Sequence, residues 1–481
     1  MKLKIRLIVM NFLQYAVWGA YLTCMGKYLG KCGLGSDIGL FYAMQGIVSL
    51  FMPALMGIIA DRWIQAQKTL GICHILAGGA MIAACFYGLA NPNPNFVGLF
   101  TLYSISVAFY MPTIALSNSV AYNALENGGL DAVKDFPPIR VFGTIGFICA
   151  MWLVDLVHFP DGFLASCLSN PADFLWAQHE PGMAIQASNT PFQFMLSGIL
   201  GILLGLYSFT LPKCAINKGE KKSFVEALGL QAFSLFKQKR MAIFFIFSML
   251  LGAALQITNG FATPFISSFA ADPAFADTFG VKYSVIIYSI SQIAETLCIL
   301  LIPFFLKRFG IKKVMLMAMI AWFFRFGLFG IGDTGSMVWA IILSMIVYGF
   351  AFDFYNISGS LFVNQETDPS IRSSAQGLFM MMTNGIGATI GTLTAQAIVN
   401  NTVKHIDRTK EEALGILRDS NDAIDWENIQ PDNLETIQDA AQTMWEGWQT
   451  AWFIFAGFAL VVAIAFWIFF PKTPVKQEVK G

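Results

Sequence analysis

Twelve stretches of the chain are apolar over the length that an α-helix needs to cross a bilayer. A helix of about 20 residues spans the roughly 30 Å of hydrocarbon. In the first half of the chain these stretches are 6–27, 38–60, 69–90, 96–118, 137–157 and 192–212. In the second half they are 240–262, 283–306, 313–332, 336–362, 373–398 and 449–470. The pattern predicts an all-α integral membrane protein with twelve transmembrane helices.

The overall composition agrees with this prediction. Of the 481 residues, 56% are hydrophobic and 12% are charged, whereas a soluble domain carries about 25% charge. The formal net charge is zero, so nothing in the charge balance indicates a nucleic-acid partner. The eight cysteines are scattered without a CxxC pair, and packing is their simplest role.

The distribution of Lys and Arg predicts the orientation of the helices. If both termini are cytoplasmic, the predicted cytoplasmic segments hold 21 basic residues and the outer segments hold 7, in agreement with the positive-inside rule. We therefore expect a six-helix bundle over 1–212, a cytoplasmic linker loop over 213–239, a second six-helix bundle over 240–472 and a cytoplasmic tail over 473–481. Gly387 and Gly391 lie four residues apart in one span, a spacing that predicts close helix packing.

Two six-helix bundles joined by a basic loop are typical of the major facilitator arrangement, in which the halves rock around a central site. Segments 57–62 and 306–313 follow the second and the eighth span. Both resemble the short cytoplasmic loop motif of that superfamily, and they occupy equivalent positions in the two halves.

The segment 399–447 interrupts the regular spacing of the spans. It carries four basic and eleven acidic residues, so we expect an extracytoplasmic insertion. Parts of it have amphipathic helical periodicity. It could form a lid over the outer vestibule, or a solvated linker with short helices.

Several kinds of enzyme are disfavoured by the motifs that the sequence lacks. There is no GxxxxGK[ST] phosphate loop, no HExxH and no GxSxG, so ATP-driven pumping and the common hydrolytic chemistries are not expected. The sequence predicts a protein that is not an enzyme and has no cofactor, with an ion gradient as the source of any coupling.

Carboxamides and carboxylates occur inside the apolar stretches of the second half. Gln256 and Asn259 are three residues apart, and so are Gln292 and Glu295, so each pair shares one helix face. Asp353 lies within a further span. A charged side chain at mid-membrane costs about 2.5–3.5 kcal/mol on insertion scales. We interpret the two acids as functional, whereas the carboxamides could form a substrate site or hydrogen bonds between helices.

A stripe in the first half follows the same helical spacing. Arg140, Thr144 and Phe147 stand at i, i+4 and i+7 of the fifth span. Arg140 lies near the predicted cytoplasmic end, so spacing alone leaves open whether it faces a site or snorkels to the membrane surface.

The chemistry of these residues limits the substrate. Few basic residues accompany the amides, which disfavours an anionic substrate. Gln and Asn both donate and accept hydrogen bonds, and Phe147, Tyr348 and Phe352 offer flat faces for a ring. These properties predict a neutral polar substrate, either a nucleoside or a saccharide.

Segments throughout the chain resemble the nucleoside:proton symporter family of the major facilitator superfamily. The segments that carry the resemblance are FLQYAVWGAYLT, FMPALMGIIADRW, DFPPIRVFGTIGF, KRMAIFFIFSMLLGAALQITN, SISQIAETL, SMIVYGFAFDFYNISGS and SSAQGLFMMMTNGIG. Of these, DFPPIR and LQITN are the most specific. The acidic segment 399–447 departs from the family pattern, in which that connection is short.

The resemblance implies proton-driven import of nucleosides across a bacterial inner membrane. Separately from the resemblance, we expect the protein to be a monomer. Its pattern of substrate-binding residues falls on Arg140, Thr144, Phe147, Gln256, Asn259, Gln292, Glu295, Tyr348 and Phe352. Asp353 matches the acidic residue of the family in the tenth span, and the match favours a site role for Arg140. We expect Glu295 or Asp353 to carry the coupled proton, and the sequence leaves open which of the two does so. The expected partners are a nucleoside, protons and the lipid bilayer.

Two other functions fit part of the same pattern. A proton-coupled sugar symporter would use the same hydroxyl-binding amides and aromatic faces. A nutrient receptor or scaffold that kept a transporter body would use 399–447 as its interaction surface, and it would bind a ligand without transporting it.

Overall fold

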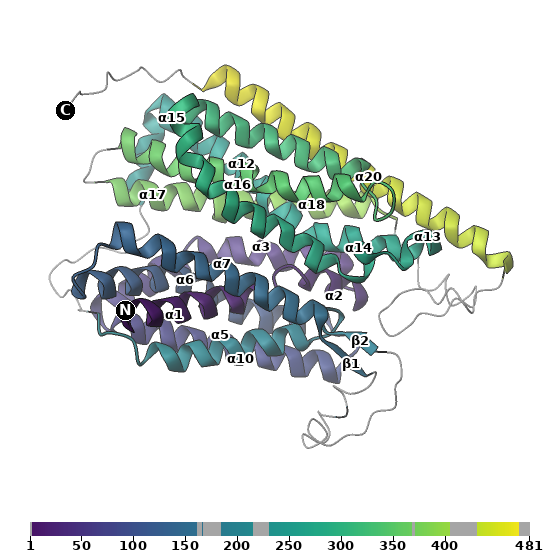
Figure 1. The fold of residues 1–481 in the computed structure, drawn as a ribbon, viewed down its shortest axis with the longest axis horizontal. Helices are drawn as coiled ribbons and strands as arrows, with labels where there is room; N and C mark the ends of the chain where they lie inside the picture. Colours follow the sequence, from purple (N-terminus) through teal and green to yellow (C-terminus); the bar gives the residue numbers. More distant parts are fainter. Residues whose placement is uncertain are drawn as a thin grey trace.

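The structure, a computed structural model, describes residues 2–160, 166, 184–214, 230–367, 371–404 and 431–470. All twelve predicted apolar stretches are helical within it. They form two helical halves that lie side by side (Figure 1). By length and apolar composition alone, seven described helices could cross a membrane, or eight if one bent pair is a single span.

The first half contains the first six predicted spans. Its helices are α1 (Lys2–Gly19), α2 (Met25–Lys31), α3 (Ile38–Ser49), α4 (Met52–Arg62), α5 (Ala66–Ala90), α6 (Phe96–Asn127), α7 (Ala132–Leu156) and α10 (Phe192–Ser208). The short 3-10 helices are η1 (Gly35–Asp37) and η2 (Ala187–Asn189), and β1 (His158–Pro160) pairs antiparallel with β2 (Ala184–Gln186). The second predicted span is the pair α3 and α4, bent by 41°.

The second half contains the other six predicted spans. Its long elements are α12 (Lys239–Ser268), α15 (Ser284–Ile331), α16 (Val338–Glu366), α17 (Arg372–Met380), η5 (Met381–Gly387), α18 (Ala388–Thr402) and α20 (Pro431–Phe469), and η5 is a π-helix. The short ones are η3 (Leu230–Lys237), η4 (Phe269–Ala271), α13 (Pro273–Ala276) and α14 (Phe279–Lys282).

The connection between the eighth and ninth spans is shorter than expected. We predicted a loop over 306–313, but α15 is broken only at Gly310, whose φ is 74° and ψ is 165°. Glycine tolerates this positive φ because it has no Cβ. A single residue therefore turns the chain from one span into the next. The side chains of Asp61 and Arg62, in the equivalent motif of the first half, lie outside the described residues.

Parts of the predicted domain boundaries also lie outside the described residues, namely 215–229 of the linker, 405–430 of the insertion and the tail 473–481. The described end of the insertion, 431–447, is helix and continues into the last span as α20. The Trp445 ring lies 6.4 Å from that of Phe269, and Met444 and Trp448 are buried. This part is a helix that packs along one face, at Ile437, Ala441 and Met444, while its other face is exposed.

The hydrogen bonds between the two halves gather at one end of the molecule. We call the end where α1 begins and α20 ends the terminal end, and the opposite end the far end (Figure 1). At the far end, Trp152 Nε1 donates to Ser289 Oγ at 2.8 Å. Gln396 Oε1 accepts from the Gly39 amide at 2.5 Å, and Gln396 Nε2 donates to the Gly35 carbonyl at 3.2 Å.

Asp155 forms the most buried part of this far-end contact. Its Oδ2 accepts from the backbone N–H of Ile286, at 3.2 Å, in the first turn of α15 of the other half. An anion is stabilised at a helix N-terminus by the unpaired N–H groups and the helix dipole. Next to it, Gln186 Nε2 donates to the Asp155 and Lys282 carbonyls at 2.8 and 2.7 Å. We call Asp155, Gln186 and their partners the far-end latch.

At the terminal end, the ion pairs remain within one half each. Lys4 Nζ lies 2.6 Å from Asp135 Oδ1, and Arg240 Nη1 lies 3.1 Å from Glu366 Oε1. The two halves are thus held together at the far end, which is the arrangement expected of a transporter that is closed on that side.

The predicted close packing at Gly387 and Gly391 is confirmed. A Cβ on Gly387 would collide with the Met249 carbonyl of α12, and one on Gly391 would collide with Ala253. Both glycines allow the backbones of α12 and the η5–α18 segment to approach closely.

We therefore expect Gly391→Ala to destabilise the protein. An added methyl in a close-packed contact costs about 1–3 kcal/mol, so the thermal unfolding midpoint in detergent should fall. Gly327→Ala in α15 is the matched control, because no atom lies within 4 Å of the added Cβ and alanine favours a helix by about 0.5–1 kcal/mol. Equal midpoints for the two variants would contradict the packing role of Gly391.

Candidate functional site

The predicted pair Gln256 and Asn259 lies on one face of α12, and the two side chains touch. Asn259 Nδ2 donates to Gln256 Oε1 at 2.9 Å, and Asn259 Oδ1 accepts from the Tyr288 hydroxyl of α15 at 2.8 Å. Both ends of the Asn259 carboxamide are therefore fixed. The Gln256 amino group donates no hydrogen bond to another described side chain or carbonyl, so its N–H donors are available to a ligand.

Tyr348 and Phe352 form an aromatic stack on α16. Their ring centroids are 5.9 Å apart with an interplanar angle of 7°. Behind them, Arg325 is fully buried and its guanidinium carbon lies 4.5 Å from the centre of the Tyr348 ring. Arg325 Nη1 donates to the Ser344 carbonyl at 2.9 Å, so this buried arginine has a hydrogen-bond partner inside the protein. Arg325 thus packs against the Tyr348 ring of the stack.

The two membrane carboxylates come from adjacent helices of the same half. Glu295 lies on α15, on the face that also carries Gln292, and both side chains are partly exposed. Asp353 lies on α16 and is 5% exposed. Its Oδ2 is buried without a hydrogen-bond partner among the described residues. A carboxylate oxygen in that state is costly unless it is protonated or meets water.

The first half contributes Arg140, Thr144 and Phe147 from α7. The Arg140 guanidinium stacks on Tyr15 of α1, with its central carbon 3.8 Å from the ring centre. Phe147 packs edge-on against Trp18, with ring centroids 6.3 Å apart. Thr144 is partly buried on the same helix. The stacking holds Arg140 inside the bundle, rather than snorkelling toward the surface.

Arg140 lies on α7 of the first half, whereas Glu295 and Asp353 lie on α15 and α16 of the second. The ion pairs within the described ranges are formed by other residues, so Arg140 does not pair directly with either acid. In the second half, the structure brings Asn259 into contact with Gln256 and stacks Tyr348 on Phe352.

Several residues next to this site were not predicted from the sequence. They share a role as supports or lining of the predicted residues: Tyr15, Trp18, Tyr288, Trp322, Asn356 and Asn384. Tyr15 and Trp18 lie three residues apart within the FLQYAVWGAYLT segment, and this spacing could have indicated a shared face. The spacing does not show which of the many aromatic residues faces the cavity.

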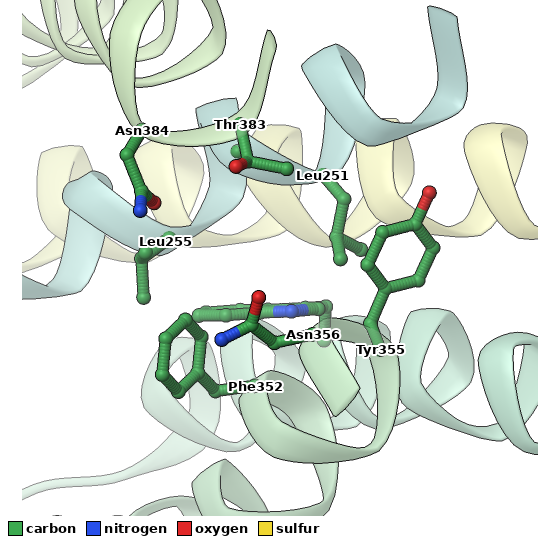
Figure 2. A pocket seen from close by; sticks show the side chains of 9 residues that line it. Leu251, Leu255, Phe352, Tyr355, Asn356, Thr383 and Asn384 are labelled. Carbon is green, nitrogen blue, oxygen red and sulfur yellow. The ribbon is translucent and has the colours of Figure 1, made fainter. Parts of the chain in front are cut away.

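A pocket with an empty volume of about 290 Å³ adjoins Phe352 (Figure 2). It is lined by Leu251, Gly252, Leu255, Trp322, Phe352, Tyr355, Asn356, Thr383 and Asn384. The lining comes from α12, α15, α16 and η5 and contains two carboxamides but no charged side chain. Such a pocket suits a neutral ligand with a flat apolar face.

A family model described as "Nucleoside H+ symporter" matches residues 1–411 of the chain. The chain belongs to the nucleoside H+ symporter family. The match ends inside the acidic segment 399–447. The protein is thus a multi-pass membrane transport protein, and the family resemblance of its sequence is confirmed.

Curated relatives of the symporter cover almost its full length. Xanthosine permease of Escherichia coli is 42% identical over 486 residues, which cover 100% of this chain and 99% of that protein. Nucleoside permease NupG of the same organism is 42% identical over 482 residues, covering 99% and 98%. Both are described as permeases and not as enzymes.

Solved structures agree with the predicted fold class. The crystal structure of a mutant form of the nucleoside transporter NupG matches the symporter with a TM-score of 0.79 and 40% identity, covering 98% of this chain and 100% of that one. The inward-open xylose transporter XylE from E. coli matches with a TM-score of 0.61 at 14% identity, covering 98% and 96%. The symporter therefore has the major facilitator fold of two helical bundles.

The hydrogen bond from Tyr288 to Asn259 predicts that Tyr288→Phe weakens nucleoside binding by about fivefold to tenfold, the usual effect of losing one hydrogen bond. Without it the Asn259 carboxamide is held only by its hydrogen bond to Gln256. Tyr21→Phe is the matched control, since the buried Tyr21 hydroxyl has no hydrogen-bond partner among the described residues. Binding of labelled uridine to purified protein measures the affinity of both Tyr variants. Gln256→Ala serves as a reference for the loss of a ligand contact. Equal affinities for the two Tyr variants would show that Tyr288 does not position the site.

Proposed function

We propose that the protein imports nucleosides across the bacterial inner membrane by proton symport, through alternating access of its two halves. The observation that carries the proposal is a buried, unpartnered carboxylate, Asp353, on the helix that also bears the Tyr348–Phe352 stack, in a member of this family whose neighbouring helices carry the Gln256–Asn259 pair. Carboxylates at this depth are typical of proton relays in transporters. The halves, 1–212 and 240–472, act as the moving bodies of a monomer joined by the linker 213–239.

We assign substrate contact to Arg140, Thr144 and Phe147 of the first half, and to the predicted residues of the second. The latter are Gln256, Asn259, Gln292, Glu295, Tyr348 and Phe352. The free donors of Gln256 suit ribose hydroxyls or the acceptor edge of a base. The stacked pair Tyr348 and Phe352 offers a flat surface for the base.

The positive-inside rule places the terminal end in the cytoplasm, with both termini there. The far end then faces outward, and the far-end latch closes the outer side. In this orientation the structure represents an inward-facing state, from which a nucleoside leaves toward the cytoplasm. The proton is the coupling ion, and the chemistry of the site calls for no other cofactor.

Glu295 and Asp353 are the proposed proton carriers. Protonation removes a buried negative charge, and this lowers the free energy of closing the cavity around the substrate. Arg140 compensates the remaining charge when the site is empty. One charge moving through 100 mV gains about 2.3 kcal/mol and one pH unit adds about 1.4 kcal/mol. Together they support roughly 500-fold accumulation for one proton per nucleoside.

Proteoliposomes that contain the protein should accumulate labelled uridine when the outside is made acidic. Accumulation should stop when a protonophore dissipates the gradient, because the proton supplies the driving force. Liposomes without protein are the control. Uptake that continues to accumulate uridine against its gradient in the presence of the protonophore would exclude proton symport.

Glu295→Gln and Asp353→Asn should show which of the two carboxylates carries the coupled proton. The variant that neutralises the coupling carboxylate should keep nucleoside exchange, since exchange needs no net proton movement, but should lose accumulation driven by the pH gradient. Asp333→Asn, at the far-end turn outside the site, is the control and should keep both activities. If both site variants accumulate uridine as the wild type does, neither carboxylate carries the coupled proton.

A saccharide remains the alternative substrate class, because amides and aromatic faces also bind sugars. Competition settles the choice: adenosine and uridine should inhibit uptake of labelled nucleoside, whereas mono- and disaccharides should not. A receptor without transport activity would bind uridine but show no flux in the same liposomes.

A further inference from the structure

The pocket beside Phe352 lies closer to the terminal end than the Gln256–Asn259 pair does. On α12, Leu251 and Leu255 precede Gln256, and α12 begins at the terminal end. On α16, Asn356 follows Phe352, and α16 ends at the terminal end, where Glu366 pairs with Arg240. A ligand that leaves the amide pair toward the terminal end therefore passes this pocket.

Two carboxamides point into the pocket from different elements. Asn356 comes from α16 and Asn384 from η5, and their side chains reach into the pocket from opposite sides (Figure 2). Both are partly buried. Neither makes a hydrogen bond with another side chain or carbonyl of the described residues. By contrast, the Asn259 carboxamide is fixed at both ends.

The π-helix η5 directs Asn384 into the pocket. π-helical turns are rare and are often found at functional sites. The turn is held by its neighbours: the Thr383 hydroxyl donates to the Phe379 carbonyl at 3.0 Å, and the Thr383 backbone lies where a Cβ on Gly252 of α12 would be. The position of Asn384 is thus fixed by the backbone, although its amide has no partner.

Aromatic side chains form the rest of a binding surface. Phe352, Trp322 and Tyr355 line the pocket, and the Tyr355 hydroxyl lies 2.9 Å from Ser248 Oγ. Two amides without hydrogen-bond partners, apolar rings and no charged side chain suit the neutral base or the ribose of a nucleoside.

We propose that Asn356 and Asn384 form a second nucleoside subsite on the release path, between the Gln256–Asn259 pair and the terminal end. The inference rests on the nucleoside transport proposed above. A nucleoside that leaves the amide pair exchanges its hydrogen bonds for those of Asn356 and Asn384 while its base stays against Phe352. Because the subsite is reached from the terminal end, it binds substrate that enters from that side.

The test compares transport in the two directions in proteoliposomes of known orientation. In Asn356→Ala and Asn384→Ala, the KM for labelled uridine that enters at the terminal end should rise about fivefold to tenfold, as expected for one lost hydrogen bond. The KM for uridine that enters at the far end should change less than twofold. Asn384→Gln should restore part of the affinity at the terminal end, whereas Asn384→Leu should not.

Asn401→Ala is the matched control, since Asn401 is exposed near the end of α18 and its amide donates to the Ala397 carbonyl. Its KM should match the wild type in both directions. An unchanged terminal-side KM in both Ala variants would overturn the subsite, and so would an equal rise on both sides. Asn356→Leu and Asn384→Leu replace the amides with side chains of similar size and test the same point if an Ala variant is too unstable to reconstitute. Wild-type protein that transports no uridine would instead refute the proposed function itself.

Discussion

A polar side chain within hydrocarbon must find a partner or face an aqueous cavity, and this constraint organises the second half of the molecule. Arg325 donates a hydrogen bond to the Ser344 carbonyl and packs against the Tyr348 ring. Asn259 forms hydrogen bonds with Gln256 and Tyr288. Among the buried atoms without a partner in the described residues is Asp353 Oδ2 of α16, and the amides of Asn356 on α16 and Asn384 on η5 line the pocket beside Phe352. These three side chains therefore offer unmet hydrogen-bonding capacity beside the proposed site.

The charges of the site are divided between the halves. Arg140 belongs to the first half and is held against Tyr15, whereas Glu295 and Asp353 belong to the second. Any movement of the halves relative to each other changes the distance between the cation and the acids. The Coulomb energy of buried charges depends strongly on distance, so the protonation of the acids and the arrangement of the halves influence each other.

The sequence predicted the helices and their polar faces well, because hydrophobic length and helical spacing are local properties. Gln256 and Asn259 share a face as expected, and all twelve apolar stretches are helical. It could not predict contacts between helices that are distant in the chain. Tyr288 and Tyr15 are two among many aromatic residues, and only packing shows that they support the site. The π-turn around Asn384 also depends on its packing against α12, and so does the helical continuation of α20 into 431–447.

The chemistry of the far-end latch bears on how easily the two halves separate. Asp155 and Gln186 bind the main chain of the opposite half, at Ile286 and Lys282. When such bonds open, water replaces each lost partner, and the net free energy per hydrogen bond is only about 0.5–1.5 kcal/mol. An apolar seal of the same area would resist opening in proportion to the surface it exposes to water. Hydrogen bonds of this kind therefore keep the open and closed states closer in free energy than an apolar seal of the same area would.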